Sequence, residues 1–190
     1  MRISHHCLSA LVMGAAGFAL PATGQEDTSR DALIVETILR IEGFDLSGST
    51  KAQGAVKRYL KDNWGGERYL DLIERFDLKE EAPGLLRLAL KKSESPAGAE
   101  AATLLVSLGK GALLAETLEK EDEVAAGQAA KAIAHTGDTT LMAALPKVLT
   151  NPDRPVSVRS SALAALYGKD PESQSKLLAM VKSNELAEDL

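Results

Sequence analysis

The sequence predicts an all-α protein built as one continuous array of helices, and three observations support this prediction. From residue 31 onward, apolar residues recur at helical spacing in segments of roughly 10 to 15 residues, separated by Gly, Pro, Asn or Asp. No stretch shows the sustained alternation of a strand. With 45% hydrophobic residues, the 190-residue chain can bury one domain-sized core but not several.

The first 24 residues are typical of a signal peptide. Arg2 places a positive charge near the start, residues 10–20 are an uninterrupted run of 11 apolar or small side chains, and Pro21 ends this run. Small residues at 22–24 suit a signal peptidase, so we expect cleavage after Gly24 and a periplasmic or otherwise exported chain. The alternative is a membrane anchor, but 11 residues are about half of the ~20 that span a bilayer.

Removal of this segment restricts the chemistry of the mature chain. The only cysteine, Cys7, leaves with the signal, and His135 is the one histidine that stays. Disulfides, cysteine nucleophiles, zinc sites with cysteine ligands and covalent haem attachment are excluded, and we expect no cofactor or metal in this chain. The mature chain has 21 basic and 27 acidic side chains and therefore a formal charge of −6. This acidic balance argues against nucleic acid as a partner.

Residues 25–78 are expected to form the N-terminal helices, over 31–41, 50–61 and 67–76. The first helix would take Ser29 or Asp31 as its N-cap and end at Gly43. The second and third are separated by Asn-Trp-Gly-Gly at 63–66, whose glycines allow backbone angles that a helix does not take.

Residues 79–190 are expected to continue the array as helical repeats. The expected helices cover residues 81–92, 97–108, 112–120, 123–136, 140–150, 156–167 and 172–181. Four prolines stand at or just before the start of a helix, where a missing N–H group costs little: Pro83, Pro96, Pro155 and Pro171.

Three of these helices repeat one another in sequence. Residues 97–109 can be laid over 125–137 and over 158–170, at offsets of 28 and 33 residues. The register aligns Ala101 with Ala129 and Ala162, and four residues later Leu105 with Ile133 and Leu166. A small residue followed at i+4 by a large aliphatic one lets a helix lie close to its neighbour. We therefore expect two-helix units stacked into an α-solenoid that is continuous with residues 25–78.

The segment Val-Arg-Ser-Ser-Ala-Leu-Ala-Ala-Leu at 158–166 resembles the second helix of a HEAT-type repeat. Residues 59–60, 65–69, 72–76, 99–102, 177–181 and 186–190 are, in addition, similar to the helical region of large exported c-type cytochrome proteins. In those proteins this region precedes a C-terminal haem domain. This chain lacks the Cys-x-x-Cys-His of that domain, so the resemblance implies a non-catalytic scaffold whose partner is a protein or a following domain, such as a c-type cytochrome.

An apolar stripe near the end of the chain also indicates a partner protein or a following domain. It has no following helix to cover it, so we expect a following domain, a partner or self-association there. The stripe comprises Leu177, Leu178, Val181, Leu186 and Leu190.

Residues 51–76 hold the strongest candidate for a partner-binding surface, because four aromatic side chains alternate there with basic ones. Aromatic residues and arginine together are common in binding hot spots. The alternative is that the aromatic residues fasten the N-terminal helices to the first repeat. The candidate partner-binding residues are Lys57, Arg58, Tyr59, Trp64, Arg68 and Tyr69.

A second class of function, a hydrolase or lyase on a helical scaffold, would need other residues. One candidate is His135, whose simpler interpretation is a polar residue at a helix C-terminus. The other is an acidic cluster at a helix junction, whose simpler interpretation is a solvated surface. This cluster contains Glu116, Glu119, Glu121, Asp122 and Glu123.

Overall fold

The computed structural model describes residues 24–166 together with residues 175 and 179, and in this part of the chain every regular element is a helix. The all-α prediction is confirmed. Three expectations fall outside the described residues: the signal peptide up to residue 23, most of the helix expected over 172–181, and the C-terminal apolar stripe.

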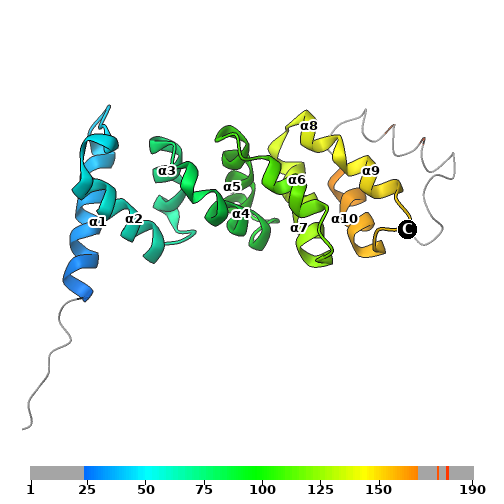
Figure 1. Cartoon of the computed structure of the whole chain (residues 1–190), viewed down its shortest axis with the longest axis horizontal. Coiled ribbons are helices and arrows are strands. Elements are labelled where there is room, and N and C mark those ends of the chain that lie inside the picture. Colours follow the sequence, from blue (N-terminus) through cyan, green and yellow to red (C-terminus); the bar gives the residue numbers. More distant parts are fainter. Residues whose placement is uncertain (1–23, 167–174, 176–178, 180–190) are drawn as a thin grey trace, which may run out of the picture.

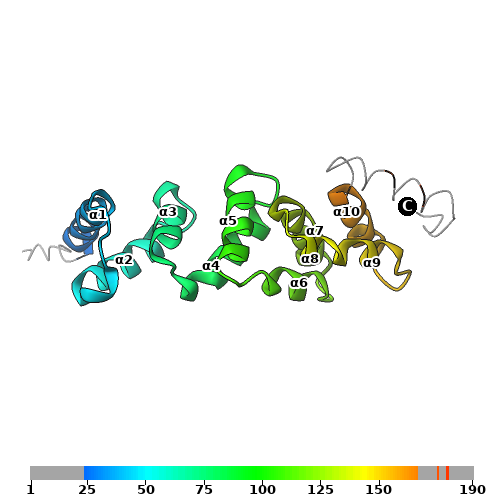
Figure 2. The ribbon, with the colours of Figure 1, turned by 90° about the horizontal axis from the view of Figure 1, so that it is seen from above.

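The helices follow one another along an extended array (Figure 1). Figure 2 shows two rows: α1, α3, α5, α7 and α10 lie along one side, and α2, α4, α6 and α9 along the other. The helices are α1 (Gly24–Arg40), α2 (Thr50–Asp62), α3 (Glu67–Phe76), α4 (Ala82–Lys91), α5 (Pro96–Ser107), α6 (Ala112–Leu118), α7 (Glu123–Thr136), α8 (Thr139–Met142), α9 (Ala144–Thr150) and α10 (Val156–Leu166), with 3-10 turns η1 (Leu46–Gly48) and η2 (Lys79–Glu81).

Four of the described α-helices, α2, α5, α7 and α8, begin with a side-chain N-cap. Ser49, Ser95 and Asp138 each accept a hydrogen bond from a backbone N–H in the first turn of the helix that follows. Asp122 accepts two, from the N–H groups of Val124 and Ala125 at 3.1 and 3.0 Å. These side chains satisfy donors that have no partner inside the helix, so the starts of the helices are locally encoded.

Two predicted boundaries are wrong. Helix α1 begins at Gly24, so Asp31 lies inside the helix and is not its N-cap; its carboxylate instead pairs with Arg58 of α2. The helix expected over 140–150 is divided at Ala143 into α8 and α9. Pro146 has no N–H with which to bond the carbonyl of Met142, so a continuous helix would lose a hydrogen bond there.

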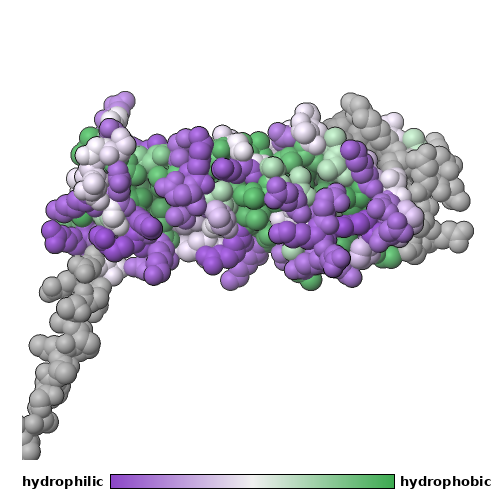
Figure 3. Space-filling view, in the orientation of Figure 1, coloured by the Kyte–Doolittle hydropathy of each residue, from purple (hydrophilic) through white to green (hydrophobic). Residues whose placement is uncertain are grey.

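The sequence repeats coincide with consecutive helices of one row. Helix α5 contacts α7, and α7 contacts α10, while α4, α6 and α9 pack on them from the other row. The aligned Ala101, Ala129 and Ala162 have no exposed surface. Because an alanine side chain is short, these positions let neighbouring helices approach closely. In Figure 3, hydrophobic atoms show between hydrophilic ridges along the array.

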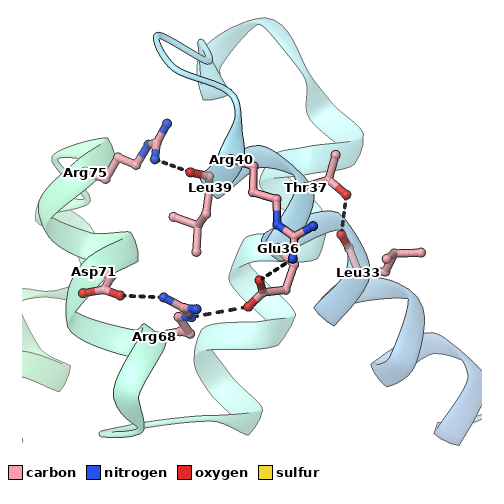
Figure 4. Close-up of polar contacts among 8 residues, drawn as sticks. All are labelled: Leu33, Glu36, Thr37, Leu39, Arg40, Arg68, Asp71 and Arg75. Carbon is pink, nitrogen blue, oxygen red and sulfur yellow. Dashed lines mark hydrogen bonds and ion pairs between the residues drawn. The ribbon is translucent and has the colours of Figure 1, made fainter.

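Arginine side chains tie helices that are distant in sequence. Arg75 at the end of α3 donates to the carbonyl oxygen of Leu39 at 2.6 Å (Figure 4) and to that of Ile41, also at 2.6 Å. Arg154 similarly donates to the carbonyl oxygens of Leu118 and Glu119 at the end of α6. The last carbonyls of a helix lack partners within it, and a cation also suits the negative end of the helix dipole. Each arginine therefore caps the free carbonyl groups at the end of one helix and links that helix to a distant part of the chain.

Within the described ranges, no single helix combines the length and the apolar character needed to cross a membrane; α5 and α6 reach both only as a pair, bent by 117° at their junction.

Candidate protein-docking surface

The six residues predicted to bind a partner lie on α2, α3 and the connection between these helices, and they differ in exposure. Lys57, Arg58 and Arg68 are exposed, Tyr59 and Trp64 are half-buried, and Tyr69 has no exposed surface. Their contacts show which of them join helices and which present a surface.

Arg58 joins α2 to α1. Its Nε and Nη2 atoms donate to the two carboxylate oxygens of Asp31, at 2.6 and 2.7 Å. The Asp31 side chain is only 6% exposed, so this carboxylate leaves water when the helices pack, and the paired guanidinium compensates for the lost hydration. Hydrogen bonding to Arg58 lowers the pKa of Asp31 below its ordinary value.

Arg68 joins α3 to α1 in a similar way. Its guanidinium lies 3.3 Å from a carboxylate oxygen of Glu36 on α1 and 3.3 Å from one of Asp71 on α3 (Figure 4). Glu36 also lies 3.8 Å from Arg40. Together with Arg75, which bonds the end of α1, Arg68 attaches the first helix to the third. The contacts of Arg58 and Arg68 thus join the N-terminal helices to one another.

Tyr69 is a core residue, so it is not a partner contact. Its hydroxyl donates to a carboxylate oxygen of Glu81 at 3.3 Å. Burial, with the negative charge of Glu81 adding to it, raises the pKa of Tyr69 well above its ordinary value. The hydroxyl lies against Gly84 on α4, where a Cβ atom would come within 2.2 Å of it. The phenol thus fits a space that exists only because residue 84 has no side chain.

Trp64, which is half-buried, contacts the side chains and backbone of α4. Its indole N–H donates to the carbonyl oxygen of Gly84 at 3.2 Å, which fixes the ring against α4. The Arg87 guanidinium lies over the ring at 3.9 Å from its centroid, and the Lys91 ammonium lies at 5.7 Å. These are cation–π distances. Arg87 and Lys91 were not among the predicted residues; their signal in the sequence is the i, i+4 spacing on a helix without an acidic residue.

Arg87 and Lys91 border a groove of about 380 Å³ between α4 and α7. Leu86 and Leu90, which are half-buried, form its apolar part with Pro83, and Gln128 of α7 closes the other side. The groove therefore offers aliphatic surface next to two cations and one amide.

Lys57 borders a second groove, also of about 380 Å³, beside η1 and η2. Its apolar lining comes from residues including Val56, Leu60 and Phe76. The carboxylates of Glu80 and Glu81 face this groove as well, so its charge is mixed.

The residues considered for catalysis are exposed, and two of them make contacts that stabilise helices. All five acids of the cluster at 116–123 are exposed, as is His135 in the last turn of α7. Asp122 caps α7, and Glu123 accepts a hydrogen bond from the hydroxyl of Ser157 at 2.7 Å, which links α7 to α10. Among the described residues, no group of three or more His, Cys, Asp and Glu side chains is arranged to hold a metal ion.

No family model, curated protein or solved structure matches this chain.

Proposed function

We propose that this chain is an exported, non-catalytic α-solenoid of HEAT type that docks a protein partner on its surface. The resemblance noted in the sequence suggests a redox protein, such as a c-type cytochrome, as that partner. Cleavage after Gly24 would remove a single residue of α1, so the helical array is compatible with removal of a signal peptide.

The observation that supports this proposal is the order of the helices with matching sequences. Helices α5, α7 and α10 are consecutive neighbours in one row, and their aligned alanines are buried. Arrays in which each unit contacts its neighbours expose a long surface relative to their mass, and such surfaces serve mainly for binding.

The fastening contacts support a rigid surface. Arg75 and Arg154 each bond carbonyl oxygens 34 to 36 residues earlier in the chain. Rigid positioning lowers the entropy lost when a partner binds. A scaffold that holds a partner in a defined place benefits from this rigidity.

The proposal is tested by site-specific photocrosslinking in cells that make the chain. A photoreactive residue is placed singly at Lys57, Leu90 or Val124, the last being 69% exposed on α7. At least one position should give a light-dependent adduct of one defined mass. A haem-stained adduct would support the cytochrome partner, and an unstained one would contradict that part. If none of the three positions gives an adduct, the docking function is refuted.

Export is tested separately by sequencing the N-terminus of the chain from the same cells. A mature chain that starts at Gln25 is expected. A chain that keeps Met1 throughout would contradict the exported state.

A further inference from the structure

The groove between α4 and α7 combines features that indicate a particular kind of ligand. Its walls are the side chains of Pro83, Leu86 and Leu90, and its rim carries Arg87, Lys91 and Gln128. An apolar wall beside fixed polar groups is the usual composition of a recognition site.

The two rim cations, Arg87 and Lys91, are exposed on α4. Of the candidate partner-binding residues, Arg58 and Arg68 each pair with a carboxylate of α1. In the part of the chain that the structure describes, no carboxylate lies within ion-pair distance of Arg87 or Lys91, although both are exposed. Because the whole chain carries a formal charge of −5, this pair forms a local positive site on an acidic protein.

Trp64 holds one of these cations in place. The guanidinium carbon of Arg87 lies over the indole ring, 3.9 Å from its centroid, and the ring is itself anchored to the carbonyl of Gly84. A cation–π contact of this kind does not consume the N–H donors of a guanidinium, so they can still bind a carboxylate. Arg87 is thus oriented before a ligand arrives, which reduces the entropic cost of binding.

We propose that this groove binds an acidic peptide segment of a partner protein. A carboxylate of the segment would pair with Arg87 and Lys91, a neighbouring aliphatic side chain would pack on Leu86 and Leu90, and the Gln128 amide would bond the peptide backbone. The aliphatic wall favours this ligand over free phosphate, which has no apolar group to place there, and the acidic net charge of the chain disfavours nucleic acid. The proposal rests on the docking function, to which it adds the site and the chemistry of the partner.

The test selects peptides from a random 12-residue library displayed on phage, with the mature chain as the target. The recovered peptides should carry Asp or Glu beside Leu, Ile, Val or Met. Their affinities are then measured by fluorescence anisotropy on two double variants, Arg87→Gln with Lys91→Gln, and Arg40→Gln with Lys51→Gln. Both variants remove one exposed arginine and one exposed lysine, and circular dichroism checks that both are folded.

Affinity should fall at least tenfold on the Arg87 and Lys91 variant and stay within twofold on the control. It should also fall as salt increases, because the recognition is ionic. Emission from Trp64, the only tryptophan of the chain, should change when the peptide binds. Peptides without carboxylates, or peptides that bind both variants equally, would overturn the proposal.

Two further probes test the other classes of anion. Inorganic phosphate at millimolar concentration and vesicles of phosphatidylglycerol are each added without peptide. Binding of either one that depends on Arg87, with no acidic peptide recovered, would overturn the proposal in favour of an anion or lipid site. Crosslinked adducts at Lys57 or Val124 without a groove-dependent peptide would refute this site and leave the docking function standing.

Discussion

The two carboxylate oxygens of Asp31 accept hydrogen bonds from Nε and Nη2 of Arg58, so that a buried acid on α1 and an exposed arginine on α2 form one planar pair. This geometry is the bidentate one in which arginine and a carboxylate bind most specifically. The pair lies at the packed contact of α1 with α2. Its protonation therefore affects how firmly the first helix is attached.

The lowered pKa of Asp31 makes a pH-dependent contribution to stability. The acid is harder to protonate in the folded state, so this contribution is complete above the unfolded pKa of about 4 and is lost as pH falls through the lower folded value. Asp31→Asn should reduce the free energy of unfolding by about 1 kcal/mol at pH 7 and by less at pH 2 to 3. Urea denaturation at these pH values measures both differences.

The control for this pair is Asp62→Asn, which removes an exposed carboxylate at the end of α2. It should change the free energy of unfolding by no more than about 0.5 kcal/mol at either pH. If Asp31→Asn and Asp62→Asn behave alike, the bidentate pair does not stabilise the fold.

Arg154→Gln tests whether an arginine closes the end of α6. The half-buried guanidinium bonds the carbonyl oxygens of Leu118 and Glu119, which would be left without these donors. We expect a loss of about 1 to 3 kcal/mol in the free energy of unfolding. The same change at Arg40, whose side chain is 81% exposed, should cost no more than about 0.5 kcal/mol. Thermal unfolding of both variants decides the point, and equal shifts would contradict the closing role.

The sequence predicts the bounds of a helix well where residues next to its ends determine them, and poorly where distant residues do. Helix α7 has the predicted bounds, Glu123–Thr136, and both of its ends are determined locally: Asp122 caps its start and Gly137 adopts the left-handed backbone, with φ 67°, at its end. Helix α1 was predicted too short because Asp31 resembles an N-cap locally. The residue that gives Asp31 its role, Arg58, stands 27 positions later.

The candidate site was less predictable than the helices, because its contacts join residues that are distant in sequence. A high local density of aromatic and basic residues pointed to residues 51–76, but the contacts that assign each residue a role come from other helices. Arg68 is paired by Glu36 of α1, and Tyr69 is buried under Gly84 of α4. Arg87 meets Trp64 only because α4 folds back beside the connection between α2 and α3. No short-range pattern encodes that approach.

The register of the repeats is tested by adding volume at one buried alanine. Ala129 on α7 has no exposed surface, so Ala129→Leu should overpack the row and cost about 1 to 3 kcal/mol in the free energy of unfolding. The same substitution at the exposed Ala112 of α6 should change it by no more than about 0.5 kcal/mol. Lys131→Leu, on another face of α7, should also cost little. Equal small effects at all three positions would show that the proposed alignment of repeats is incorrect.

The contact between Gly84 and Tyr69 leads to a prediction in which the sign of an effect changes. In the unmodified protein, a Cβ at residue 84 would lie 2.2 Å from the buried Tyr69 hydroxyl oxygen, so Gly84→Ala should destabilise the fold by about 1 to 3 kcal/mol. Without that hydroxyl, the nearest ring atom is Cζ at 3.5 Å, which is an ordinary contact. Glycine in a helix is less favourable than alanine by about 0.5 to 1 kcal/mol.

Gly84→Ala should therefore be neutral, or stabilising by up to about 1 kcal/mol, when it is made in a Tyr69→Phe background. Tyr69→Phe alone should cost about 1 kcal/mol, because Glu81 loses a hydrogen bond. Denaturation of the four chains, followed by Trp64 emission, gives the coupling energy of the two positions. Since the indole bonds the Gly84 carbonyl, its emission also reports any displacement of α4. A cost of Gly84→Ala that is the same in both backgrounds would mean that the tyrosine hydroxyl does not set the approach of α3 to α4.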